Sequence, residues 1–152
     1  MNLLFVCTAN ISRSFLADQL FKHRIEKLRL NDVFSDSAGI FRMPGRTADP
    51  VMVEYLEEMG ITPIEHMSKQ IEKEHVDWAD LILVMEWAHL EKIELSWPED
   101  IEKVELLGKY ISNDDNEDEI LDPFGRSSFH YRVAQSQIEL AIDGLIRRRV
   151  LV

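Results

Sequence analysis

The chain opens with Leu3-Leu4-Phe5-Val6-Cys7-Thr8-Ala9-Asn10-Ile11-Ser12-Arg13-Ser14, in which an apolar run leads into a short polar loop. The run predicts a buried strand at residues 3–6, and a helix is expected from Arg13 onward. The loop between them presents its backbone N–H groups at a helix N-terminus, where anions bind readily. Cys7 is the only cysteine, and this setting beside a guanidinium favours its nucleophilic thiolate form. The stretch therefore predicts a nucleophile in a phosphate cradle.

Beyond this stretch, apolar runs alternate with segments of helical period, which is typical of βαβ units around a mostly parallel sheet. Strands are expected at residues 3–6, 33–38, 81–85 and 104–107. Helices are expected from Arg13 onward, from Asp49-Pro50 to Gly60, within 69–76, over 87–95 and from about Ser128 towards Arg149. We therefore predict an α/β fold, a three-layer sandwich in which helices flank a four-stranded, mostly parallel sheet.

Length and composition are typical of one globular domain. The chain has 152 residues, of which 45% are hydrophobic and 30% charged, so we expect a single domain over residues 1–152. No segment of the sequence is apolar enough to span a membrane, and no basic stretch precedes the first apolar run as in an export signal. A lone thiol is preserved in a reducing compartment, so we expect a cytoplasmic protein with no membrane partner.

The charge balance is acidic. The formal net charge is −11, from 28 acidic and 17 basic residues, which argues against a nucleic-acid partner bound through its phosphates. Much of the excess lies in one run, Asp114-Asp115-Asn116-Glu117-Asp118-Glu119. Such a run is usually a solvated loop. The alternative hypothesis is that it favours substrates with basic residues near the phosphate.

Further motifs follow the 7–14 loop in a fixed order along nearly the whole chain. They are Ser37-Ala38-Gly39, Asp49-Pro50, Gly60-Ile61, His66, Ala79-Asp80-Leu81-Ile82-Leu83-Val84-Met85 and Asp122-Pro123-Phe124-Gly125. With these motifs the chain resembles the low-molecular-weight protein tyrosine phosphatases. The resemblance implies a hydrolase without metal or other cofactor, which removes phosphate from phosphotyrosine-containing proteins through a cysteinyl-phosphate intermediate. It also implies that phosphate or vanadate binds in the loop.

The resemblance also assigns roles to residues. It makes Cys7 the nucleophile, Arg13 the bidentate clamp on the phosphoryl oxygens and Asp122 the general acid and base. The other residues expected around the phosphate are Thr8, Ala9, Asn10, Ile11, Ser12 and Ser14. The residues expected to support the loop are Ser14, which would hydrogen-bond the sulfur, and Asn10 with its partners Ser37 and His66. The residues expected to wall the substrate cleft are Phe124 and one of Phe41 and Met43.

Two positions of the loop depart from the pattern of the family. Ser12 stands where many members have a second cysteine, so the reversible disulfide that protects the nucleophile from peroxide cannot form. Ala9 replaces the usual glycine, which narrows the range of backbone angles open to the loop. We therefore expect irreversible oxidation of Cys7, whereas the sequence leaves open whether Ala9 alters the loop geometry.

Other functions stay open at the level of sequence. Phosphoarginine hydrolysis is the nearest, and within the family a smaller polar residue at the position of Ile11 goes with that substrate. Arsenate reduction uses the same loop but relays a disulfide through further cysteines, which this chain lacks. A silent phosphate-binding module needs neither a thiol nor an acid, so the presence of Cys7 and Asp122 together argues against it.

Overall fold

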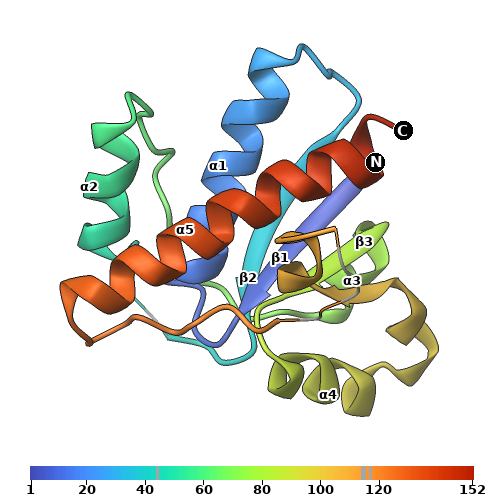
Figure 1. Ribbon diagram of the computed structural model, residues 1–152. Helices are drawn as coiled ribbons and strands as arrows, with labels where there is room; N and C mark the ends of the chain where they lie inside the picture. Colours follow the sequence, from blue (N-terminus) through green and yellow to red (C-terminus); the bar gives the residue numbers. More distant parts are fainter. Residues whose placement is uncertain (44, 114–115, 117) are drawn as a thin grey trace.

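The computed structural model describes residues 1–43, 45–113, 116 and 118–152, and a four-stranded sheet lies at its centre (Figure 1). The strands are β1 (Asn2–Cys7), β2 (Phe34–Gly39), β3 (Leu81–Val84) and β4 (Val104–Leu106). Their order is β2-β1-β3-β4, and each neighbouring pair is parallel. Each strand begins and ends within one residue of the prediction, and the sheet is parallel throughout.

The helices also follow the predicted order. They are α1 (Arg13–Lys27), α2 (Pro50–Glu58), α3 (Lys73–Trp78), α4 (Trp87–Ser96) and α5 (Ser128–Leu145). Short 3-10 segments lie at Pro98–Lys103 and Leu107–Tyr110, and a π-helical turn at Ile146–Val150 follows α5. Helix α2 begins as the sequence predicts, because the carboxylate of Asp49 accepts a hydrogen bond from the Val51 N–H at 3.0 Å.

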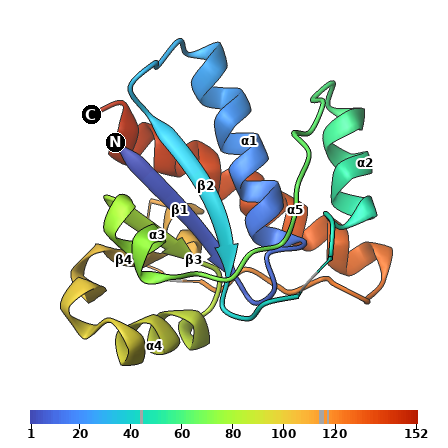
Figure 2. The ribbon, with the colours of Figure 1, turned by 180° about the vertical axis from the view of Figure 1, so that it is seen from behind.

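Two hydrophobic cores cover the two faces of the sheet, with α1, α2 and α5 on one face and α3 and α4 on the other (Figures 1 and 2). Side chains of a strand point alternately to opposite faces. In β1, Leu3 and Phe5 accordingly enter the core under α1 and α5, and Leu4 and Val6 enter the other core. This arrangement is the predicted three-layer sandwich.

The strand order places the 7–14 loop where an open α/β sheet binds its ligands. From β1 the chain passes first to β2 on one side and later to β3 on the other, so the order reverses at β1. Ligands of such sheets bind at the carboxyl ends of the strands, beside this reversal. Strand β1 ends at Cys7, and α1 begins at Arg13. The two chain termini lie together at the opposite end of the sheet (Figure 1).

Two sequence-based expectations concern the surface of the molecule. Within the described ranges, none of the helices has the length and apolar character needed to cross a bilayer.

Asp114, Asp115 and Glu117 of the acidic run lie outside the described residues. Within that run, the Glu119 carboxylate accepts a hydrogen bond from the Trp87 N–H at 2.8 Å, at the start of α4.

Candidate active site

Asn10 forms the bend of the 7–14 loop. Its φ of 57° lies in the left-handed region, which asparagine tolerates better than most other residues with a side chain. The side-chain amide Nδ2 donates to the hydroxyls of Ser14 and Ser37, both at 2.9 Å. Its Oδ1 accepts from the Lys69 N–H at 3.1 Å. The bend is therefore tied to α1, to β2 and to the segment that follows α2.

The backbone carbonyls of the loop also have partners outside it. His66 Nε2 lies 2.7 Å from the Asn10 carbonyl oxygen, and the Ser68 hydroxyl donates to the Ala9 carbonyl at 2.6 Å. Gly39, the last residue of β2, packs directly against the loop: a Cβ atom there would lie 2.8 Å from Ala9 C and from Asn10 N. These contacts hold the loop backbone in one conformation.

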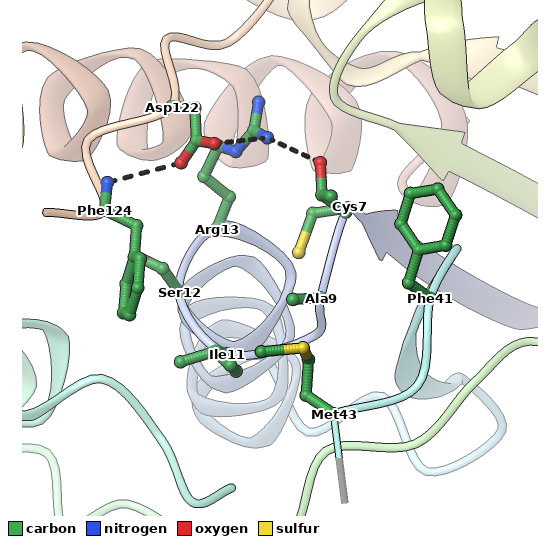
Figure 3. Close-up of a pocket in the computed structure, with 10 residues that line it drawn as sticks. Cys7, Ala9, Ile11, Ser12, Arg13, Phe41, Met43, Asp122 and Phe124 are labelled. Atoms are coloured by element: carbon green, nitrogen blue, oxygen red, sulfur yellow. Dashed lines mark hydrogen bonds and ion pairs between the residues drawn. The ribbon is translucent and has the colours of Figure 1, made fainter.

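Cys7 and Ser14 lie at the two ends of the loop and contact each other. The Cys7 Sγ lies 2.9 Å from the Ser14 Oγ, and both residues are buried. The Ser14 Oγ already accepts a hydrogen bond from the Asn10 amide, so its own proton is available to the sulfur. A hydroxyl that donates to sulfur stabilises the thiolate. Figure 3 shows the sulfur pointing towards the centre of the labelled group of residues.

Arg13, at the end of the loop, carries a buried positive charge. Only 2% of its side chain is exposed, and a buried charge is stable only with partners. Its Nη1 donates to the Ile120 carbonyl oxygen at 2.8 Å, and its Nη2 donates to the Glu86 carboxylate at 2.7 Å. The Asp122 carboxylate lies 3.6 Å from Nη2 (Figure 3). Two carboxylates therefore flank the guanidinium.

A cavity of about 240 Å³ opens above these groups. Its lining residues are Cys7, Thr8, Ala9, Ile11, Ser12, Arg13, Phe41, Met43, Asp122 and Phe124. Phe41 and Met43 both line it, although the sequence left open which of them would. Asn10 and Ser14, expected near the phosphate, are absent from this lining; their side chains are buried and support the loop. The cavity thus has a polar base and apolar walls.

Phe41 and Phe124, the two phenylalanines that line the cavity, each make a cation–π contact. The Lys92 Nζ lies 5.8 Å from the centroid of the Phe41 ring, and the Arg46 guanidinium lies 5.6 Å from that of Phe124. About half of each phenylalanine is exposed, 53% and 46% respectively. An aromatic ring that enters the cavity therefore meets apolar surface with positive charge at its rim.

Asp49 is an anchor of the loop that sequence reasoning recognised only as the start of a helix. Its N–H donates to the Ile11 carbonyl at 3.0 Å, and its buried carboxylate accepts from the Tyr131 hydroxyl at 2.6 Å. Burial and this hydrogen bond raise the pKa of Tyr131, so its hydroxyl stays a donor. Asp49 thereby connects the loop with α2 and α5.

Two further residues of the site, Glu86 and His89, escaped the sequence analysis. Glu86 is the partner of Arg13 described above. The Nε2 of His89 lies 2.9 Å from the Thr8 hydroxyl, and burial together with the charge of Arg13 lowers the pKa of His89 to about 4. Their only sequence signal is position, because both follow the predicted third strand of the sheet. In the described part of the chain, no three His, Cys, Asp or Glu side chains are grouped to hold a metal ion.

Comparison with known proteins identifies the family. A sequence model described as low molecular weight phosphotyrosine protein phosphatase matches residues 2–150. The chain belongs to this family. Its members are hydrolases, and its fold is the one described above.

The relatives include enzymes named for two different substrates. A protein-arginine-phosphatase of Geobacillus stearothermophilus is 37% identical over 96% of this chain and 94% of its own length. The low molecular weight protein-tyrosine-phosphatase Wzb of Escherichia coli is 33% identical over 91% of this chain and 88% of its own length. The crystal structure of a low molecular weight phosphotyrosine phosphatase from Vibrio cholerae superimposes with a TM-score of 0.87, at 25% identity, and covers 100% of this chain and 99% of its own.

Proposed function

We propose that this protein is a tyrosine phosphatase that hydrolyses phosphotyrosine in proteins through a phosphorylated Cys7. The supporting observation is the cavity itself, in which the thiol, a buried guanidinium and the Asp122 carboxyl line one space beneath apolar walls. Cys7 is the nucleophile, Arg13 holds the phosphoryl oxygens, and Asp122 is the general acid and base.

In the first half-reaction, the Cys7 thiolate attacks phosphorus and the bond from phosphorus to the tyrosine oxygen breaks. Phosphoryl transfer has a loose transition state, so the loop N–H groups and Arg13 act by positioning the group and stabilising its spread charge. The planar fork of arginine suits two oxygens at once. Asp122 gives its proton to the departing phenolate oxygen, so tyrosine leaves as the neutral phenol.

In the second half-reaction, the Asp122 carboxylate takes a proton from a water molecule, whose oxygen attacks phosphorus. The bond from phosphorus to sulfur breaks, inorganic phosphate is released and the Cys7 thiolate is regenerated. The Ser14 hydroxyl, 2.9 Å from the sulfur, stabilises the thiolate both as attacking and as leaving group.

The apolar wall around the cavity favours phosphotyrosine over phosphoarginine. Ile11 is buried in that wall and lines the cavity with Met43 and Phe41. An aromatic ring gains free energy by burial against these side chains, whereas a guanidinium would lose its hydrogen bonds to water there. Phosphoarginine hydrolysis is the second candidate, because the relative from Geobacillus stearothermophilus at 37% identity is named for that activity.

The test compares two peptides of the same sequence, one with phosphotyrosine and one with phosphoarginine, in a buffer without metal. We expect the higher kcat/KM for phosphotyrosine, inhibition by vanadate and no turnover by Cys7→Ser. The matched variant Ile11→Thr should shift the ratio of the two kcat/KM values towards phosphoarginine. Faster hydrolysis of phosphoarginine by the unaltered protein would replace the proposal by the second candidate.

We also propose the setting in which this activity is used. The chain acts as one domain over residues 1–152 in the cytoplasm, with phosphotyrosine-containing proteins as its partners. The single thiol, which a reducing compartment preserves, supports the location. The net charge of −11 supports the absence of a nucleic-acid partner.

A further inference from the structure

The hydroxyl of Thr8 has a hydrogen-bond partner on each of two sides. Thr8 follows the nucleophile directly and lines the same cavity. Its Oγ1 lies 2.9 Å from the His89 Nε2 and accepts from the Arg13 Nη2 at 3.4 Å. Whether the hydroxyl donates its proton to His89 or accepts one from it depends on the tautomer of His89.

The structure fixes that tautomer through the start of α4. The His89 Nδ1 accepts a hydrogen bond from the backbone N–H of Glu86 at 3.2 Å, so Nδ1 carries no proton. Burial and the nearby Arg13 lower the pKa of His89 to about 4, so the ring is neutral at neutral pH. Its single proton is therefore on Nε2, and His89 donates to Thr8.

The Thr8 hydroxyl proton is then left for a ligand. A threonine hydroxyl has two lone pairs and one proton, and here His89 and Arg13 donate to the lone pairs. Both Nη2 protons of Arg13 are also engaged, one with Glu86 and one with Thr8. On this side of the cavity, the Thr8 hydroxyl is therefore a donor in addition to the remaining N–H groups of Arg13.

We propose that Thr8 donates its hydroxyl proton to a phosphoryl oxygen, and that His89 is the positioning residue that keeps the hydroxyl in this orientation. The inference rests on the proposed function only in that the loop binds a phosphoryl group. It adds a side-chain donor to the loop N–H groups and Arg13. Hydrogen bonds to a charged oxygen are the stronger ones, so loss of this donor weakens ligand binding measurably.

Thr8→Val tests the donor, because valine matches the shape of threonine without its hydroxyl. The probe is orthovanadate, whose dissociation constant is measured by titration calorimetry, together with kcat/KM for p-nitrophenyl phosphate. We expect Thr8→Val to weaken vanadate binding by about tenfold or more. Thr8→Ser, which restores the hydroxyl, should recover most of this loss. Equal vanadate affinity of Thr8→Val and the unaltered protein would overturn the proposal.

A double-mutant cycle tests the role of His89. His89→Leu removes the donor to Thr8, and His89→Gln replaces it with an amide N–H. We expect His89→Leu to weaken vanadate binding in the unaltered background but not in the Thr8→Val background, and His89→Gln to lose less. An equal loss in both backgrounds would show that His89 acts on the fold and not through Thr8. If His89→Leu does not fold, His89→Phe, which also lacks a donor to Thr8, takes its place in the cycle.

Vanadate binding tests the role of Thr8 independently of which phosphorylated substrate the protein hydrolyses. A protein that binds vanadate but hydrolyses no phosphotyrosine peptide would refute the proposed function, while the Thr8 comparison would still give its answer. An unaltered protein that binds no vanadate would overturn both.

Discussion

Asp122 differs from Cys7 and Arg13, the other two residues that we propose to be catalytic, in that half of its side chain, 50%, is exposed. A general acid accelerates the reaction most when the leaving group needs a proton. We expect Asp122→Ala to lower kcat/KM, which reports formation of the intermediate, on a phosphotyrosine peptide by about a hundredfold or more, and on an activated aryl phosphate by much less. Steady-state kinetics on the two substrates checks this. Equal losses on both would contradict the role of Asp122 as general acid.

Ser12 influences how Cys7, the proposed nucleophile, responds to peroxide. Its hydroxyl is buried beside the cavity, and within the described chain it has no hydrogen-bond partner. A cysteine there would condense with a Cys7 sulfenic acid, releasing water and forming a reducible disulfide. With serine, we expect oxidation to proceed to the irreversible sulfinic and sulfonic acids.

Activity and mass spectra after peroxide and then a thiol reductant check this expectation. The matched variant Ser12→Cys should recover its activity, and the unaltered protein should not. Full recovery of the unaltered protein would refute the prediction.

At the scale of elements, the end of β2 holds the active-site loop by close approach of two backbones. A Cβ at Gly39 would lie 2.8 Å from Ala9 C and Asn10 N, so the loop must shift to admit it. We expect Gly39→Ala to lower both the melting temperature and the kcat/KM of the folded protein. Gly60→Ala is the control: Gly60 has a φ of 78° at the end of α2, so alanine adds strain there without touching the loop. If Gly60→Ala lowers kcat/KM as much as Gly39→Ala does, close packing at Gly39 has no special role.

The sequence predicted the elements well because their signals are local. Apolar runs at residues 3–6 and 81–85 mark strands, and Asp49-Pro50 and Gly60 mark the ends of a helix. Cys7 and Arg13, which the motif of the 7–14 loop singles out, line one cavity.

The rest of the site depends on contacts between distant parts of the chain. Glu86 lies 73 residues from Arg13, His89 lies 81 residues from Thr8, and Tyr131 lies 82 residues from Asp49. Nothing in the local pattern of a glutamate or a histidine says which partner the folded chain will bring to it. The strand order brings the end of β3 beside the end of β1 and so creates the first two pairs, whereas the third joins α5 to the start of α2.

For the whole molecule, His89 makes stability depend on pH in a definite direction. Burial and Arg13 lower its pKa from 6.5 to about 4, against the opposing effects of Glu86 and Asp122. In the unfolded chain, His89 takes up a proton below about pH 6.5. In the folded protein, it takes up this proton only below about pH 4. Stability is therefore complete above this window and is lost as pH falls through it, by about 2 kcal/mol between about pH 7 and pH 5.

Urea unfolding of the protein and of His89→Gln at both pH values measures this contribution. We expect the loss of unfolding free energy on acidification to be smaller in the variant. The comparison of the two proteins cancels the contributions of other groups. One of these is Asp18: burial raises its pKa, so its contribution to stability changes with pH in the opposite direction. Equal losses in both proteins would contradict the assignment.

Transfer of the phosphoryl group to the sulfur of Cys7 is the central claim, and trapping the intermediate tests it most directly. Asp122→Ala slows hydrolysis of the intermediate, so this variant is mixed with an activated aryl phosphate, whose departure needs no general acid, carrying radiolabelled phosphate and is quenched within the first turnover. The account predicts label on the Sγ of Cys7, and none in the double variant that also carries Cys7→Ala. Label on another residue, or release of phosphate without labelled protein, would contradict it.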